Sequence, residues 1–293
     1  MDLIWRIRRL PRLGATIAKK SILAVSTIFS ILAVVTTFLP IEEILLLVNK
    51  LLPKMGVAST LSDNLKTRIL LLCSLSILGL VYGFVFCLKG RNVIYQKEKT
   101  AIIVEYGDLN RYICNNENHK PYTVVIPIND HLDTVADSSK VRPNSNHGSW
   151  LKQMKASGLT ENEIHKKVLD GTSDVQNNIC PIGTCISIEC QNVHYLLLVI
   201  ATLENRVAHC PEKQYLEGMQ SLLDELSNSR VNIDEPIYMP VIASGYANTD
   251  MNKSIQELTH MMAELLKFNA AAIQNPVHIV VYEKDQKDVS IFV

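Results

Sequence analysis

The sequence predicts an α/β protein in two parts, with a pair of transmembrane helices near the N-terminus followed by an α/β domain. Residues 21–39 and 69–88 are long apolar runs without a charged side chain. The chain from residue 89 onward has the composition of a soluble domain and is long enough to bury its own core. There, short β-branched or aliphatic runs alternate with segments of helical spacing, which is typical of a sheet with helices on both faces.

Both apolar runs have the length and pattern of membrane-spanning helices. Each has about 20 residues, enough for a helix to cross a hydrocarbon core of about 30 Å. Neither run has the polar stripe of a buried soluble helix. A cleaved signal peptide is the rival interpretation of the first run, but the run is too long and residues 40–43 offer no small-residue cleavage site. We expect transmembrane helices at about 21–40 and 69–88 in a membrane segment of residues 1–94.

The flanking charges predict the orientation of this membrane segment. Basic residues precede the first run and follow the second, whereas the basic residues of the connecting stretch 41–68 are offset by acidic ones. The positive-inside bias therefore predicts a multi-pass protein of the inner (cytoplasmic) membrane with both termini in the cytoplasm. Small and hydroxyl residues in both runs favour close helix packing, so we expect a homo-oligomer. The absence of charged residues from the runs argues against a transporter.

Composition excludes several classes of function. The 29 basic and 29 acidic residues cancel, whereas nucleic-acid binding usually needs a basic surplus. The seven cysteines are scattered, and the five-residue spacing of Cys180, Cys185 and Cys190 is not that of a zinc site. We interpret them as reduced core cysteines in a reducing compartment. The chain has no Ser/His/Asp triad, Walker loop or metal-ligand spacing, so we expect no cofactor and no metal.

The part of the chain after residue 89 divides into predicted strands, helices and two long loops. Strands are predicted at residues 101–105, 123–128, 185–188, 195–202, 237–242, 278–282 and 289–293. Helices are predicted at residues 150–169, 212–226 and 252–273. Residues 137–149 and 226–236 are predicted to be long loops, and such loops in a compact domain are often functional.

Polar and glycine residues follow the apolar runs where ligands of such domains usually bind, at the carboxyl ends of strands. The four relevant stretches are residues 104–109, 125–134, 178–184 and 239–248. Ser244-Gly245-Tyr246 precedes a helix and suits a diphosphate, because glycine lets backbone amides approach phosphate oxygens. Asp108 can accept a hydrogen bond from an exocyclic amine such as that of adenine, and Asn129 can bind ribose hydroxyls. Singly, these residues are ordinary turn residues, so the prediction depends on their joint placement.

Four of these motifs occur in the order seen in macro domains, and the chain resembles that family over about residues 95–293. They are Gly107-Asp108-Leu109, Ile128-Asn129, Cys180-Pro181-Ile182-Gly183 and Pro240-Val241-Ile242-Ala243-Ser244-Gly245. The resemblance implies a cytosolic, three-layer α/β/α macro-like domain with a mixed sheet that binds ADP-ribose. The second strand ends in Asn-Asp-His-Leu-Asp and not in the usual Asn-Ala-Ala-Asn, and residues 137–149 replace a glycine-rich stretch. These departures argue against hydrolysis, so we expect a binding protein and not an enzyme.

The variant motifs, together with two N-terminal membrane helices, resemble the membrane-anchored, ThsA-like effectors of Thoeris anti-phage defence. That resemblance implies that a partner TIR-domain enzyme converts NAD into a signal nucleotide, an ADP-ribose conjugate of histidine. The macro domain would bind this nucleotide, and the membrane part would then disrupt the lipid bilayer and abort the infection.

The resemblance also implies roles for individual residues. Asp108 would face the adenine and Asn129 the distal ribose, while Asp133 and His147 would meet the group attached to that ribose. The diphosphate would be cradled by Gly183, Thr184, Ser244, Gly245, Tyr246 and Ala247. Two alternatives stay open. One is a membrane-tethered ADP-ribosyl hydrolase with Asp130, Asp133 or His147 as acid or base, and the other is a scaffold that has lost its ligand.

Overall fold

The computed structural model describes residues 77, 79, 81–82 and 90–293, with the exception of 115–119, 137–139, 173–178, 229–234 and 246–249. The chain forms two compact units, Met1–Gly90 and Arg91–Val293, whereas the sequence placed the boundary after residue 94. The predicted transmembrane helices at 21–40 and 69–88 lie almost wholly outside the described residues and stay predictions. Among the residues that are described, no helix combines the length and the apolar character needed to cross a membrane.

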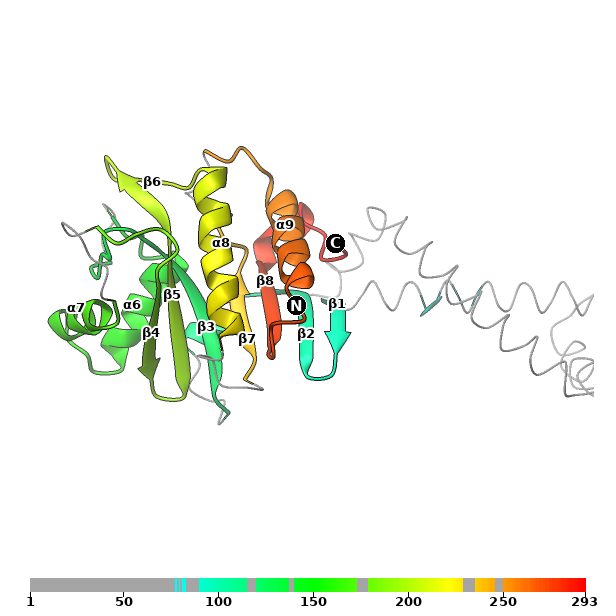
Figure 1. Cartoon of the computed structure of the whole chain (residues 1–293), viewed down its shortest axis with the longest axis horizontal. Coiled ribbons are helices and arrows are strands. Elements are labelled where there is room, and N and C mark those ends of the chain that lie inside the picture. Colours follow the sequence, from blue (N-terminus) through cyan, green and yellow to red (C-terminus); the bar gives the residue numbers. More distant parts are fainter. Residues whose placement is uncertain are drawn as a thin grey trace, which may run out of the picture. The chain divides into compact units, whose positions relative to one another are not determined.

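The second unit is a mixed α/β domain, as the sequence predicted, and Figure 1 shows its helices packed against a twisted sheet. The strands are β1 Arg91–Lys97, β2 Thr100–Gly107, β3 Tyr122–Asn129, β4 Cys185–Cys190, β5 Val193–Glu204, β6 Val207–His209, β7 Ile237–Pro240 and β8 Pro276–Tyr282. The helices are α5 Asn110–Cys114, α6 Asn146–Ala156, α7 Glu161–Asp170, α8 Glu212–Ser227 and α9 Ile255–Phe268, with the 3₁₀ helix η4 at Glu283–Lys287.

The order of strands across the sheet is β1-β2-β8-β7-β3-β5-β4, and β6 pairs with β5 outside this path. Strands β2, β8, β7, β3 and β5 run parallel to one another, whereas β1, β4 and β6 are antiparallel to their neighbours. Strand β3 is buried along almost its whole length, as expected of a parallel strand with helices on both faces. The carboxyl ends of the five parallel strands therefore meet at one edge of the sheet.

Two separate hydrophobic clusters cover the two faces of the sheet. Helices α8 and α9 lie on one face, where Leu222 and Met262 pack against strand residues such as Ile279. Helices α5, α6 and α7 supply the other cluster, in which Trp150 and Tyr195 are fully buried. This arrangement is the three-layer α/β/α architecture.

The predicted helix at 150–169 is wrong as a single element, because it is two helices, α6 and α7. Helix α6 ends at Ala156 with Ser157 as its C-cap, and Gly158 has a positive φ of 91°, a conformation that favours glycine. Thr160 then caps α7 in a reciprocal capping box with Glu163. The apolar spacing continued across this break and hid the stop and start signals. The predicted helices at 212–226 and 252–273 are confirmed as α8 and a shorter α9.

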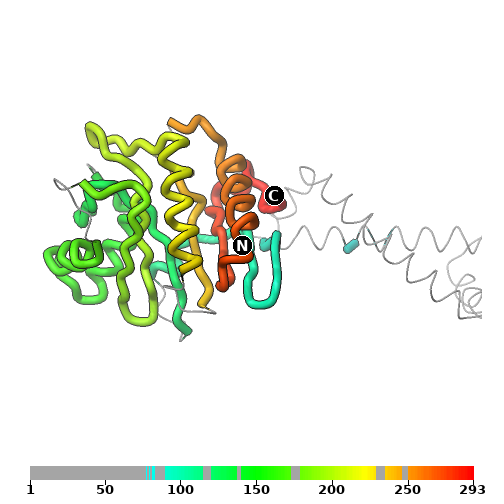
Figure 2. Tube along the Cα trace, viewed as in Figure 1, coloured from blue at the N-terminus to red at the C-terminus, as the bar shows by residue number. Residues whose placement is uncertain are grey.

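The C-terminal segment is not the predicted strand at 289–293. It forms a tail without regular secondary structure, and its backbone forms hydrogen bonds with side chains. The Tyr106 hydroxyl donates to the carbonyl of Val289 (2.8 Å) and accepts from the amide of Ile291 (3.2 Å). The side chain of Asn92, in β1, donates to the carbonyl of Ile291 (3.0 Å). Figure 2 shows the C-terminus beside α9, where the amide of Ser290 donates to Gln256. The tail thus ties the first strand to the last residues. Strands β1 and β6 and helix α5 were not predicted.

Candidate functional site

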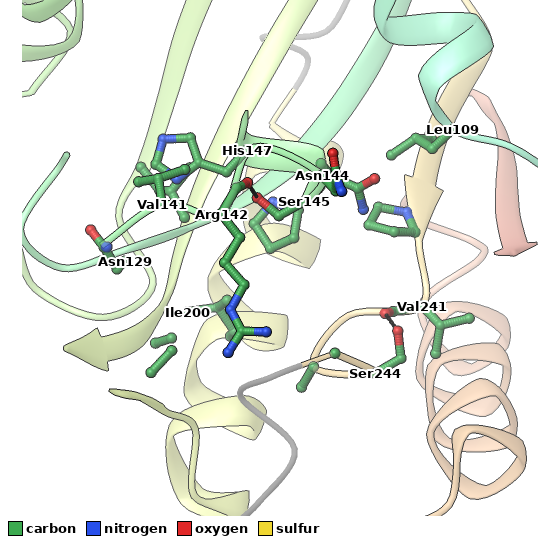
Figure 3. Close-up of a pocket in the computed structure, with 18 of the residues that line it drawn as sticks. Leu109, Asn129, Val141, Arg142, Asn144, Ser145, His147, Ile200, Val241 and Ser244 are labelled. Atoms are coloured by element: carbon green, nitrogen blue, oxygen red, sulfur yellow. Dashed lines mark hydrogen bonds between the residues drawn. The ribbon is translucent and has the colours of Figure 1, made fainter. Parts of the chain in front are cut away.

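A cavity of about 620 Å³ lies at the edge of the sheet where the parallel strands end (Figure 3). Each of the five strands contributes residues at or just beyond its carboxyl end, which is the usual ligand position in an open α/β sheet. The cavity is also lined from the amino-terminal end of α6 and from the β5–β6 hairpin. From the strand ends come Asp108, Asn129, Ala201, Leu203, Val241, Ala243, Ser244, Gly245 and Tyr282, and from the other two elements Arg142, Ser145, Asn146, His147, Arg206 and Val207.

Asp108 forms the wall of the cavity at the end of β2. Its Oδ1 accepts a hydrogen bond from the amide of Asn110 (2.9 Å), so the carboxylate also caps the short helix α5. Just before it, a side chain at Gly107 would crowd Val280, because an added Cβ would lie 3.2 Å from a methyl group of that residue. The hydrogen bond from Asn110 and the close packing of Gly107 against Val280 therefore fix the position of Asp108 in the cavity wall.

The turn after β7 forms the next wall. The Ser244 hydroxyl donates to the carbonyl of Val241 (2.6 Å), and the amide of Ser244 points to the same oxygen (3.3 Å). Ala243 adopts a positive φ of 61°, which is uncommon for a residue with a side chain and concentrates at functional sites. The sequence suggested Gly245 as the residue that gives this turn its unusual backbone. In the structure, the residue with the positive φ is Ala243.

A polar cluster surrounds the end of β3. The Nδ2 of Asn129 donates to one carboxylate oxygen of Asp133 (3.1 Å), and Lys140 binds the other oxygen (2.9 Å). The Oδ1 of Asn129 is buried, and it has no hydrogen-bond partner within the described part of the chain. A buried carbonyl oxygen without a partner at a cavity wall is suited to accept a hydrogen bond from a ligand hydroxyl.

His147 is a neutral residue of the cavity wall. Its imidazole bonds to the backbone of Asp133 and lies 5.9 Å, centroid to centroid, from the ring of Trp150. Burial lowers the pKa of His147 from 6.5 to about 4, and the nearby Asp133 opposes this shift only in part. At neutral pH the ring therefore contributes hydrogen bonding to the cavity but no charge.

The depressed pKa of His147 predicts a specific loss of stability in acid. The unfolded chain takes up this proton near pH 6.5 and the folded chain only near pH 4. The stability contributed by the neutral ring is thus complete above pH 6.5 and is lost as the pH falls towards 4. Over that window we expect the unfolding free energy of the natural protein to fall by about 3 kcal/mol more than that of His147→Asn. Urea titrations at several pH values test this, and parallel slopes for both proteins would contradict it.

The amino-terminal turn of α6 is a feature that the sequence analysis missed. Ser145 caps this helix by accepting from the amide of Gly148 (3.0 Å), and both its amide and its hydroxyl donate to the carbonyl of Arg142 (3.0 and 2.8 Å). His147, predicted to lie in a long loop, is therefore a residue of the first helical turn. Ser145 was the available signal, because serine is a common helix N-cap. The signal was weak, since the third residue after it is Gly148 and not the Glu or Gln of a capping box.

The hairpin between β5 and β6 was missed as well. Asn205 and Arg206 form its two-residue turn with φ values of 49° and 67°, the type I′ pattern. This turn places Arg206 and Val207 on the cavity wall. Asn-Arg is a weaker turn signal than Asn-Gly or Asp-Gly, so the sequence does not mark this hairpin clearly.

The structure brings together five of the residues that the sequence proposed for ligand binding. Asp108, Asn129, His147, Ser244 and Gly245 all line the cavity, and Asp133 binds Asn129 from behind it. Tyr246 and Ala247 lie outside the described residues.

Gly183 and Thr184 are not part of the cavity lining and instead form the turn into β4. Gly183 has a φ of 89° and donates its amide to the carbonyl of Val199 (2.8 Å). A Cβ on Gly183 would overlap the side chain of Ser221 in α8. Thr184 donates its hydroxyl to the carbonyl of Pro181 (2.8 Å). In this position, glycine serves a tight turn packed against a helix.

A family model described as "Thoeris protein ThsA, Macro domain" matches residues 102–282. Among the curated proteins, none matches the chain. Similar solved structures include a point mutant of the Oceanobacillus iheyensis macrodomain with ADPR, at 13% identity and TM-score 0.45, covering 67% of this chain and 92% of that chain. Another is the Trypanosoma brucei macrodomain in complex with ADP-ribose, at 12% identity and TM-score 0.39, covering 64% and 65%.

Proposed function

We propose, given that this chain belongs to the family of Thoeris ThsA macro domains, that its cavity binds a signal nucleotide derived from ADP-ribose. The observation that carries the proposal is the convergence of Asp108, Asn129 and Ser244 on one cavity at the carboxyl edge of the sheet. Its volume of about 620 Å³ is in the range of sites that enclose small molecules, roughly 300–1,000 Å³.

The strand order supports an orientation for this ligand. Asp108, at the end of β2, would accept a hydrogen bond from the adenine amine, and Asn129, at the end of β3, would bind the distal ribose. The turn at Val241–Ser244 follows β7, which lies between β2 and β3 in the sheet, so it would contact the diphosphate. The first turn of α6 faces the same cavity, and a helix N-terminus favours anions.

We propose that the domain binds its ligand without hydrolysing it. Both carboxylate oxygens of Asp133 are engaged, one by Asn129 and the other by Lys140, so this residue is poorly placed to activate a water molecule. The ring of His147 is bonded to the backbone of Asp133 and is neutral at physiological pH. These contacts suit Asp133 and His147 to positioning the group attached to the distal ribose.

The finer proposal is that the protein is the membrane effector of an anti-phage system. The ligand would be histidine-ADP-ribose made from NAD by a partner TIR-domain enzyme, and the two apolar runs at 21–40 and 69–88 would disrupt the inner membrane as a homo-oligomer. Such switching requires that the ligand bind the active arrangement more tightly than the resting one. Both termini must face the cytoplasm, because the signal arises from cytosolic NAD.

The proposed function is tested by the affinity of purified full-length protein for ADP-ribose and histidine-ADP-ribose. We expect Asp108→Ala to weaken binding by about ten- to a hundredfold, because a hydrogen bond to a charged group contributes about 1.5–3 kcal/mol. Asp108→Asn is the matched control for folding, since its amide oxygen can still cap α5. Calorimetry measures the ligand affinity of the natural protein and of both variants. Absence of binding to ADP-ribose, NAD and amino-acid conjugates of ADP-ribose would contradict the proposal.

A membrane-tethered ADP-ribosyl hydrolase is the alternative, and the same protein tests it. Chromatography would then show turnover of an ADP-ribosylated substrate that is lost in Asp133→Ala. Binding without turnover supports the sensor, and a cavity that binds no nucleotide supports a scaffold.

A further inference from the structure

The charged residues of the cavity are sorted along the edge of the sheet. Asp108 follows β2 and Asp285 lies in η4 after β8, so the acidic groups gather at the β2–β8 end. The basic residues lie towards the β3–β5 end and α6, and they are Lys140, Arg142 and Arg206. Lys140 forms an ion pair with Asp133, and the two arginines are the other basic residues of the cavity lining.

Arg142 projects into the cavity from a well-anchored position. Its carbonyl accepts two hydrogen bonds from Ser145, the capping residue of α6. Figure 3 shows its side chain extending from the α6 end into the cavity, down to the level of Ile200. The guanidinium therefore extends into the same cavity as the amino-terminal end of α6, whose field also favours an anion.

Arg206 approaches the cavity from the β5–β6 hairpin, which is anchored on both of its strands. The amide of Leu203 donates to Oδ1 of the buried Asp130 (3.0 Å). On the other strand, His209 contacts Asp250 (2.9 Å), close to the start of α9. The turn thus holds Arg206 on a fixed wall.

Part of the backbone cradle expected for a diphosphate lies away from this cavity in the described part of the chain. Gly183 and Thr184, expected to form one side of it, lie outside the lining. A diphosphate carries two negative charges, which must be balanced when it leaves water. Arginine presents a planar fork of donors that matches phosphate oxygens.

We propose that Arg142 and Arg206 bind the ligand diphosphate and thereby determine its specificity for dianionic nucleotides. This inference rests on the proposed function, because it assigns the anionic part of the same ligand. The adenine end, at Asp108, is independent of both arginines. Binding of a diphosphate should accordingly weaken as salt screens the arginines, whereas binding of adenosine should not.

The test uses full-length protein and three probes, which are inorganic pyrophosphate, ADP-ribose and adenosine. We expect Arg142→Gln and Arg206→Gln each to weaken pyrophosphate and ADP-ribose binding by about tenfold and to reduce its salt dependence, with adenosine binding unchanged. Arg142→Lys should give an intermediate affinity, because it keeps the charge and loses the fork. Lys152→Gln removes a charge from the exposed face of α6 and is the matched control.

The outcomes separate this inference from the proposed function. A second variant combines Arg142→Gln with Arg206→Gln. The inference is overturned if this double variant binds pyrophosphate as tightly as the natural protein does, or if neither protein binds it. This holds even if ADP-ribose binds. Adenosine binding that falls in parallel with pyrophosphate binding also overturns it, since the arginines would then act on the fold. If the protein binds pyrophosphate through the arginines but does not bind ADP-ribose, the result refutes the proposed ligand and not the anion site.

Discussion

Replacing Gly148 with alanine is expected to abolish tight ligand binding and to destabilise the domain. The added Cβ would overlap the carbonyl oxygen of Arg142 and would lie 2.9 Å from Cα of Pro143. Both are backbone atoms, so a side-chain rotation cannot relieve the clash. The segment from Arg142 to Ser145 must therefore move away from α6, and the cavity wall moves with it. Overpacking of this kind costs about 1–3 kcal/mol.

The effect of Gly148→Ala on binding should exceed tenfold, because the displaced segment carries Arg142 and the cap of α6. Urea denaturation and calorimetry with ADP-ribose measure the two effects. Ser149→Ala is the matched control on the same helical turn, as it adds no atom and keeps the backbone bond from residue 149 to Ser145. If the Gly148→Ala protein keeps its stability and affinity, then Gly148 does not pack closely against the backbone of Arg142 and Pro143, which contradicts the prediction.

Trp150→Ala is expected to cost about 3–5 kcal/mol of unfolding free energy, as for large aromatic residues in other cores. The side chain is fully buried beneath the cavity wall, and its ring meets Tyr195 at a centroid distance of 6.4 Å with the planes at 63°. Removing it leaves a void between α6 and the sheet. A loss of this size is a large part of the stability of an ordinary domain, so partial unfolding is expected near body temperature.

Trp150→Phe is the informative companion of this variant. The indole Nε1 is buried and has no hydrogen-bond partner among the residues described, so its loss removes an unsatisfied donor. We expect Phe to cost clearly less than Ala in urea denaturation followed by circular dichroism. Equal losses for both variants would indicate that the indole nitrogen has a partner that matters for stability.

The sequence predicted those features whose evidence lies within a single strand or helix. Asp108, Asn129 and Ser244 each directly follow an apolar run, and parallel strands bring their carboxyl ends together, so their meeting was predictable. The stripe of apolar residues in α9 likewise indicated its buried face, and its Ser254–Glu257 capping box marks its start.

The residues that were missed lie in turns for which the sequence gives only a weak signal. Arg206 reaches the cavity only because β6 folds back along β5 through a turn without glycine. Gly183, predicted to help cradle the diphosphate, packs against α8 and lies outside the cavity lining, and a glycine of a phosphate loop and a glycine packed against a helix look alike in sequence. The basic residue Arg142 lay in a stretch read as a loop, where periodicity gives no direction for a side chain.

The hydrogen bond between Asn92 and Ile291 has a consequence for the timing of biosynthesis. These residues are 199 positions apart, so this link between the first strand and the C-terminal tail forms only when nearly all of the domain has left the ribosome. Contacts of such long range form late and slowly in folding. The predicted membrane runs, which come earlier in the chain, are thus synthesised before the nucleotide-binding domain is closed. Under the proposed function, the segment that would act on the membrane is therefore made before the domain that would control it is complete.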